Sequence, residues 1–206
     1  MVVVVAAVVV VVVVAVVSVV GSSSRSSISI KKSTIKSNIN NEKNSTFDDK
    51  EYLNELEFHL QKAVDIQSIA DVPLGAFLSG GIDSSIITAL MQKNSSMPVK
   101  TFTVGFSESS FDESSYAKEV ATHLRTDHSE LFVSNSEARD IIPLLPHIYD
   151  EPFADSSQIP TFLVSKLARE KVTVAVTGDA GDELFGGYNR YVLTREFWGK
   201  LSNLPI

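Results

Sequence analysis

The sequence predicts an α/β domain, a mainly parallel sheet with helices on both faces. From residue 48 onward, short apolar segments rich in β-branched residues alternate with segments of helical periodicity, which is typical of such sheets. Two loops rich in glycine and acidic residues, at 79–85 and 177–187, each follow a predicted strand directly. Parallel sheets bind ligands at the carboxyl ends of strands, where the strand order reverses. Both loops are therefore expected to open onto one edge of the sheet.

Composition divides the 206-residue chain near residue 46. Residues 22–46 carry five basic side chains and one acidic side chain, whereas residues 47–206 carry 13 basic and 24 acidic ones. The net charge of −7 leaves no basic excess, which argues against a nucleic acid as the main partner. The chain has no cysteine, so disulfides, thiolate metal sites and cysteine nucleophiles are excluded. The 160 residues from 47 to 206 are enough to bury a full core.

The first 20 residues form a low-complexity tract, in which residues 2–20 comprise 15 Val, 3 Ala and 1 Ser. As a helix, residues 2–20 would be about 28 Å long, which is close to the thickness of a bilayer core. A membrane anchor would leave the following basic residues in the cytoplasm. The open alternatives are an artefact of a repeat in the coding DNA or of an incorrect gene start, a dispensable tail, and an interfacial or targeting segment. Residues 21–46 are predicted to be a flexible linker.

The predicted domain, residues 47–206, begins with an amphipathic helix at 48–67 that Asp48 caps. Pro143 and Pro146 should bend or divide a later helix at 137–148. The aromatic residues Phe102, Phe106, Phe185 and Trp198 are expected to pack in the core or between helices. The other predicted elements are strands at 74–78, 100–106, 128–133 and 172–176, and helices at 86–92, 114–124 and 160–170.

The first loop, Ser79–Ser85, reads Ser-Gly-Gly-Ile-Asp-Ser-Ser. Paired glycines let the backbone approach an anion and present successive N–H groups to it, and the following helix N-terminus adds positive potential. Asp83 would repel a bare phosphate, so the loop predicts a divalent cation, and Mg²⁺ held by one or two carboxylates and by phosphates fits. The loop is neither a Walker A motif nor a dinucleotide-binding loop. The alternative is an ordinary strand–turn–helix junction in which Asp83 caps the helix.

The second loop begins Thr-Gly-Asp-Ala-Gly-Asp-Glu at residues 177–183, with three carboxylates in five positions. Clustered acids at a strand end are costly unless a cation neutralises them. A second cation-binding loop at the same sheet edge is one interpretation, and a solvated acidic turn is the other.

The motifs also resemble a known family. Ser-Gly-Gly-Ile-Asp-Ser resembles the pyrophosphate loop of the N-type ATP pyrophosphatases, which have the adenine nucleotide alpha hydrolase-like fold. Together with this loop, the runs Asp150–Ser157 and Gly178–Tyr188 resemble the synthetase domain of glutamine-dependent asparagine synthetases. The first loop alone would also fit the synthetases for GMP, NAD and argininosuccinate and tRNA-lysidine synthetase, and the second run does not exclude a β-lactam synthetase-like ligase.

The resemblance implies that ATP activates aspartate as an acyl-adenylate, with release of pyrophosphate, and that ammonia then forms the amide. It implies a catalytic role for Asp179 and a Mg²⁺ ion held by Asp83 and Asp182. Asp150, Glu151 and Asp155 either border the aspartate pocket or take part in helix capping at Ser156. The positions that match ATP- and pyrophosphate-binding residues are Leu78, Ser79, Gly80, Gly81, Asp83, Ser84, Val104, Thr177 and Gly178.

Two departures from the family pattern bear on function. The family begins with a glutaminase domain whose nucleophile is an N-terminal cysteine, whereas residue 2 here is Val and cysteine is absent. The family also continues past Ile206, so the domain is expected to be C-terminally incomplete. The implied protein is a cytoplasmic ligase that takes aspartate and ammonia, and the sequence is compatible with a homo-oligomer. The alternative is a nucleotide-binding fragment or pseudoenzyme without catalysis.

Overall fold

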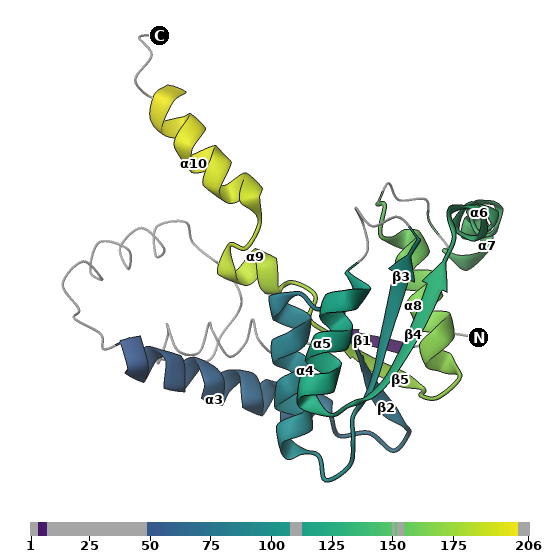
Figure 1. The fold of residues 1–206 in the computed structure, drawn as a ribbon. Helices are drawn as coiled ribbons and strands as arrows, with labels where there is room; N and C mark the ends of the chain where they lie inside the picture. The colour runs from purple at the N-terminus through teal and green to yellow at the C-terminus, as the bar shows by residue number, and fades with distance from the viewer. Residues whose placement is uncertain (1–3, 8–48, 108–112, 150, 152–154, 202–206) are drawn as a thin grey trace.

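A computed structural model describes residues 4–7, 49–107, 113–149, 151 and 155–201. Its centre is a five-stranded sheet in the order β1-β5-β2-β3-β4, in which every neighbouring pair is parallel (Figure 1). The predicted α/β class with a parallel sheet is confirmed. The strands are β1 (Val4–Ala7), β2 (Leu74–Phe77), β3 (Lys100–Phe106), β4 (Asp127–Val133) and β5 (Val174–Thr177).

Helices connect the strands and follow the last of them. Pro143 and Pro146 divide the segment after β4, as predicted, because each stands in the first turn of a new short helix. The helices are α3 (Asp49–Gln67), α4 (Ile82–Asn94), α5 (Ser114–Leu124), α6 (Asn135–Asp140), the 3₁₀ helix η2 (Ile142–Leu144), α7 (Leu145–Ile148), α8 (Gln158–Arg169), α9 (Gly181–Phe185) and α10 (Asn189–Leu201).

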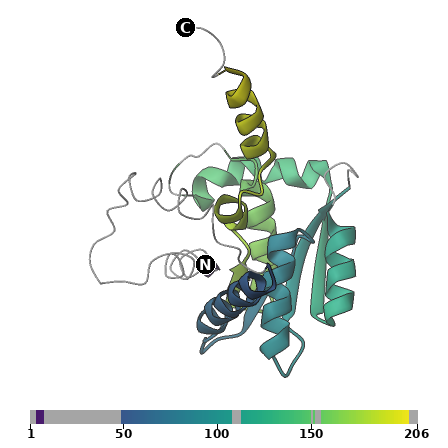
Figure 2. The same ribbon diagram turned by 90° about the vertical axis from the view of Figure 1, so that its left-hand side faces the viewer.

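The two faces of the sheet are covered by different helices (Figures 1 and 2). On one face, Phe102 of β3 is fully buried against Ala168 of α8. On the other face, Leu78 packs on α5, and α4 packs on β2 and β5. Successive residues of a strand point to opposite faces, so the neighbours of Phe102, Thr101 and Thr103, are buried on the α4–α5 side.

The strand order reverses at β2. After β2 the chain adds β3 and β4 on one side, and it then crosses the sheet so that β5 pairs with the opposite side of β2. The carboxyl ends of β2 and β5 are therefore adjacent at the switch point of the sheet, where open α/β sheets bind ligands. This topology brings together the two glycine-rich loops, as the sequence predicts.

The sheet includes one strand from the N-terminal valine tract. Val4–Ala7 form β1, which pairs with the outer edge of β5 from Val174 to Thr177. These four residues are therefore extended and not part of a helix. The remainder of the tract, the predicted linker at 21–46 and the predicted cap Asp48 lie outside the described residues. Within the described ranges, no helix combines the length and the apolar character that a bilayer crossing requires.

Several boundaries differ from the sequence prediction, and the largest differences lie around the two loops. Helix α4 begins at Ile82 rather than 86, because the loop's own polar residues form its first turn. The predicted second loop contains α9, and α10 follows it. Phe185 and Trp198 were expected to be packed, but they are 52% and 69% exposed. They stand on α9 and α10, and α10 extends away from the sheet (Figure 1).

Candidate functional site

The loop after β2 is held in a compact form by its two serines. The backbone N–H of Ser79 donates to Oγ of Ser84 at 3.2 Å, and the two hydroxyl oxygens are 3.0 Å apart. The N–H of Gly81 donates to Oγ of Ser79 at 3.3 Å. Gly80 has a φ of 81°, and a β-carbon there would lie 2.6 Å from the backbone nitrogen of Ala117 in α5. The turn therefore requires glycine at position 80, because its backbone is in direct contact with α5.

The loop leads into the N-terminus of α4, which has no side-chain cap. The N-cap residue is Gly81, and Asp83 stands in the first turn. The interpretation of Asp83 as a helix cap is therefore wrong. The first N–H groups of a helix have no partner within the helix, and its dipole is positive at this end. An uncapped N-terminus beside a glycine-rich turn suits an anion such as a phosphate group.

The loop after β5 lies directly against the first loop. A β-carbon on Gly178 would be 2.7 Å from the backbone nitrogen of Ser84 and 2.8 Å from the carbonyl carbon of Asp83. Only glycine allows this approach. In the same loop, the hydroxyl of the buried Thr177 donates to Oδ2 of Asp179 at 2.9 Å and so orients that exposed carboxylate.

Two predicted metal-binding carboxylates meet at this junction. Asp83 accepts a hydrogen bond from the backbone N–H of Asp182, at the start of α9. Burial raises the pKa of Asp83, and the negative charges of Asp182 and Glu183 raise it further. The carboxylate of Asp182 itself lies against Gly187. Among the described residues, no group of three acidic, histidine or cysteine side chains is arranged to hold a metal ion.

Leu78 and Val104 contribute their backbone to this edge, since their side chains are in the core. Leu78 is 1% exposed, and its N–H and carbonyl bond to Phe102 and to the hydroxyl of Thr103. The side chain of Val104 packs against a cluster that includes Val133. Strand β3 continues beyond its last pair with β2, Phe77 with Phe102, so residue 104 lies past the end of β2.

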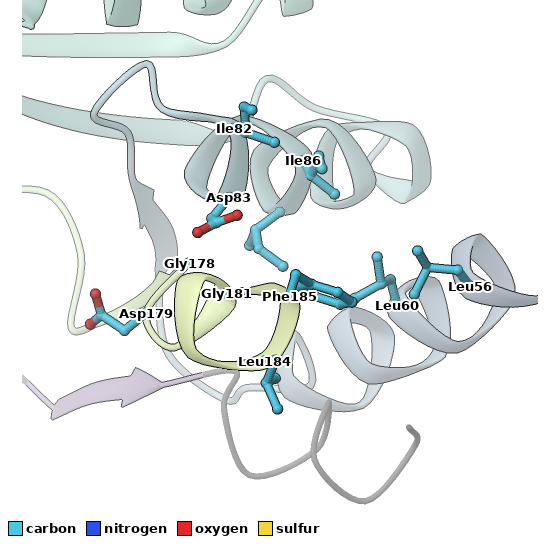
Figure 3. Close-up of a pocket in the computed structure, with 11 residues that line it drawn as sticks. Leu56, Leu60, Ile82, Asp83, Ile86, Gly178, Asp179, Gly181, Leu184 and Phe185 are labelled. Carbon is cyan, nitrogen blue, oxygen red and sulfur yellow. The ribbon is translucent and has the colours of Figure 1, made fainter. Parts of the chain in front are cut away.

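A cavity of about 190 Å³ adjoins the junction of the loops (Figure 3). Asp83, Gly178 and Asp179 border it, but none of the other predicted nucleotide-binding residues does. Sequence analysis did not predict this cavity, because its other walls come from three separate helices. They are Leu56 and Leu60 of α3, Ile82, Ile86 and Ile87 of α4, and Gly181, Leu184 and Phe185 of α9.

The acidic run before α8 is described only in part. Asp155 accepts a hydrogen bond from the backbone N–H of Ser157, the N-cap residue of α8, at 2.8 Å, and this bond lowers the pKa of Asp155. The bond closes a turn just before α8, whose N-cap Ser157 makes no side-chain cap hydrogen bond. Asp150 lies outside the described residues, and Glu151 is exposed.

Ala180 offers a test of the local geometry, since it has a left-handed backbone with φ 68° and ψ 9°. This conformation costs an L-residue about 1 kcal/mol more than glycine. We expect Ala180→Gly to raise the free energy of unfolding by about that amount in urea denaturation. Ala168→Gly, at a fully buried position in the last turn of α8, is the matched control and should lower it by about 1 kcal/mol. A lower stability of Ala180→Gly would contradict the assigned backbone geometry.

The parallel sheet, with paired loops at its switch point, defines an α/β domain, and the family match that follows places it in the adenine nucleotide alpha hydrolase-like class. The family model described as Asparagine synthase matches residues 55–205, which is most of the chain. The chain therefore belongs to the asparagine synthase family.

Relatives of this chain occur in archaea and bacteria. Asparagine synthetase 1 (glutamine-hydrolysing) of Bacillus subtilis is 43% identical over 129 residues, which cover 63% of this chain and 20% of that protein. A relative in Methanocaldococcus jannaschii is 42% identical over 143 residues, covering 69% and 28% of the two chains. Asparagine synthetase B (glutamine-hydrolysing) of Escherichia coli is 35% identical over 152 residues, covering 66% and 27%. The chain thus matches between a fifth and three tenths of the length of these relatives.

Proposed function

We propose that this chain performs the ATP-dependent part of asparagine synthesis. The observation that carries the proposal is the contact between the two loops, where Gly178 lies against the backbone of Asp83 and Ser84. An anion-binding turn and a carboxylate pair thereby share one sheet edge, which is what a nucleotide with a divalent cation requires. The names of the relatives favour asparagine synthesis over the other ligases that have a pyrophosphate loop.

In the proposed first step, a side-chain carboxylate oxygen of aspartate attacks the α-phosphorus of ATP, and the bond from that phosphorus to pyrophosphate breaks. The turn of Ser79, Gly80, Gly81 and Ser84 would hold the pyrophosphate at the N-terminus of α4. Leu78, Val104, Thr177 and Gly178 would contact the rest of the nucleotide. Asp83 and Asp182 are the residues that would hold Mg²⁺, which supplies neutralisation of phosphate charge when bound.

In the proposed second step, the nitrogen of ammonia attacks the acyl carbon, and AMP leaves with the former carboxylate oxygen. Ammonia loses a proton as the amide forms. We assign Asp179 to accept it, because its carboxylate is exposed at the loop junction and is oriented by Thr177. The 206 residues hold no cysteine, so none of them can act as a thiolate nucleophile that releases ammonia.

The first step predicts an exchange reaction. We expect the purified chain to incorporate labelled pyrophosphate into ATP when Mg²⁺ and aspartate are present, because adenylate formation is reversible. Glutamate in place of aspartate is the control and should support little exchange. Binding of ATP without any aspartate-dependent exchange would contradict the proposal and would leave a nucleotide-binding domain without catalysis.

A further inference from the structure

Strand β3 extends beyond the end of β2 at the carboxyl edge of the sheet (Figure 1). The last pair of the β2–β3 ladder is Phe77 with Phe102, whereas β3 continues to Phe106. On its other side, β3 is paired with β4 over its full length, and Val104 lies opposite Leu131. The end of β3 therefore has one edge paired with β4 and one edge that faces the space past β2, at the switch point of the sheet.

The direction of the backbone groups at this end follows from the last contact between β3 and the chain after β2. The N–H of Leu78 donates to the carbonyl of Phe102 at 3.0 Å, so the backbone groups of Phe102 face β2. In a strand, the N–H and the carbonyl of one residue point to the same side, and those of the next residue point to the opposite side. The N–H and the carbonyl of Val104, two residues further on, therefore face the space past the end of β2.

A side chain makes the bond that a longer ladder would make here. If the parallel ladder continued, the carbonyl of Leu78 would accept the N–H of Val104. Among the hydrogen bonds of the described residues, this carbonyl accepts the hydroxyl of Thr103 and not the N–H of Val104. Thr103 is 4% exposed and Leu78 is 1% exposed, so the bond is closed to water. The hydroxyl of Thr103 therefore ends the ladder one hydrogen bond early.

Two donors compete for the carbonyl of Leu78. A buried carbonyl that lacks a donor is costly, so this one will pair with whichever donor the fold offers. The hydroxyl of Thr103 is that donor in this structure. Without it, the N–H of Val104 is the replacement that the geometry of a parallel ladder provides. Val104 itself is only half-buried, so its backbone is accessible to a ligand at the edge of the sheet.

We propose that Thr103 is a positioning residue for the base of the nucleotide. Its hydroxyl occupies the carbonyl of Leu78, so the N–H of Val104 can donate to a ring nitrogen of adenine and the carbonyl of Val104 can accept the adenine amino group. Guanine has an oxygen in place of that amino group and would set it against the carbonyl of Val104. This role of Thr103 rests on the proposed function, which makes ATP the ligand.

Hydrogen exchange of the Val104 amide, measured by NMR in the full chain without nucleotide, tests the competition between the two donors. Thr103→Val removes the hydroxyl, so the Val104 amide should pair in its place and exchange at least about tenfold more slowly. Thr103→Ser keeps a hydroxyl and should exchange like the unaltered chain. Thr101→Val is the matched control, because it removes another buried hydroxyl of β3, one that lies 2.9 Å from Oγ1 of Thr126 and from Nδ1 of His128. It should leave the exchange at Val104 unchanged.

Binding measurements with Mg²⁺ present test the contact with the base. Thr103→Val should bind ATP about five- to tenfold more weakly, the effect of losing one hydrogen bond, whereas Thr103→Ser should bind it normally. Inorganic tripolyphosphate has no base, so both variants should bind it like the unaltered chain. In the unaltered chain, ATP should slow the exchange of the Val104 amide and tripolyphosphate should not. Thr103→Ala also lacks the hydroxyl and replaces Thr103→Val if that variant does not fold.

Equal losses of affinity for ATP and for tripolyphosphate in Thr103→Val would overturn the proposal, because they would show that Thr103 only supports the loop. Unchanged ATP affinity in that variant would also overturn it, and so would a Val104 amide that exchanges at one rate in every variant. A chain that meets these expectations but shows no aspartate-dependent exchange of pyrophosphate would leave the role of Thr103 intact and refute the proposed synthetase activity. The two failures are therefore distinguishable.

Discussion

We expect Gly178→Ala to weaken ATP binding by about 100-fold, because it separates the two loops that form the site. The added β-carbon would lie 2.7 Å from the nitrogen of Ser84 and 2.8 Å from the carbonyl carbon of Asp83. Both are backbone atoms in the first turn of α4, so they cannot turn aside as a flexible side chain would. The loops must move apart, and overpacking of this kind also costs about 1–3 kcal/mol of stability. Equilibrium dialysis with ATP and a urea denaturation series measure the two effects.

Gly186→Ala is the matched control for this change. Gly186 has a φ of 70°, but a β-carbon there would meet no atom within 4 Å. This variant should lose about 1 kcal/mol of stability through backbone strain alone and should bind ATP normally. If Gly178→Ala instead kept the ATP affinity of the unaltered chain, the contact between the loops would not be needed for the site.

Asp83→Asn should weaken the binding of ATP in Mg²⁺ without lowering the stability of the fold. The substitution keeps an oxygen that can accept the N–H of Asp182, but it removes a charge that burial and two neighbouring carboxylates disfavour. The raised pKa of Asp83 means that the folded state destabilises its charged form, so the variant should be at least as stable as the unaltered chain. Loss of a residue that only supports a metal ligand costs about 10–100-fold in metal affinity. Asp83 is proposed as a direct ligand of Mg²⁺, so its loss should reduce the affinity for ATP in Mg²⁺ at least as much.

The measurement is ATP affinity with Mg²⁺ and with EDTA, alongside the thermal unfolding midpoint. Glu183→Gln is the control, since it also removes a negative charge beside Asp83 but keeps an acceptor for Tyr188. It should retain the dependence on Mg²⁺. An equal loss of affinity in Mg²⁺ and in EDTA for Asp83→Asn would show that this residue has a structural role only.

The regular core could be predicted from the sequence because local pattern and tertiary packing agree there. Strand β3 and helix α5 have the predicted bounds, since one is a β-branched and aromatic run and the other ends at the left-handed Arg125. The start of α4 was placed too late because Ser and Asp favour turns as well as first helical turns. Periodicity also gave no sign that Phe185 and Trp198 would be exposed, because exposure depends on where α9 and α10 lie.

The adjacency of the loops could be predicted from the sequence, since it follows from parallel strands and short loops. The cavity could not, because Leu56, Ile86 and Phe185 come from three helices whose packing no local pattern specifies. The positive φ of Ala180 was equally hidden, because alanine is a strong helix former.

The central claim is that two loops distant in sequence form one cation-dependent nucleotide site, and a double-mutant cycle tests it most directly. Asp83 and Asp182 are 99 residues apart (182 minus 83). Affinity for ATP in saturating Mg²⁺ would be measured for the unaltered chain, for Asp83→Asn, for Asp182→Asn and for the double variant. If both carboxylates hold the same ion, the two losses should be coupled by about 0.5–3 kcal/mol. If the losses simply add, the two carboxylates act independently and the single shared site is contradicted.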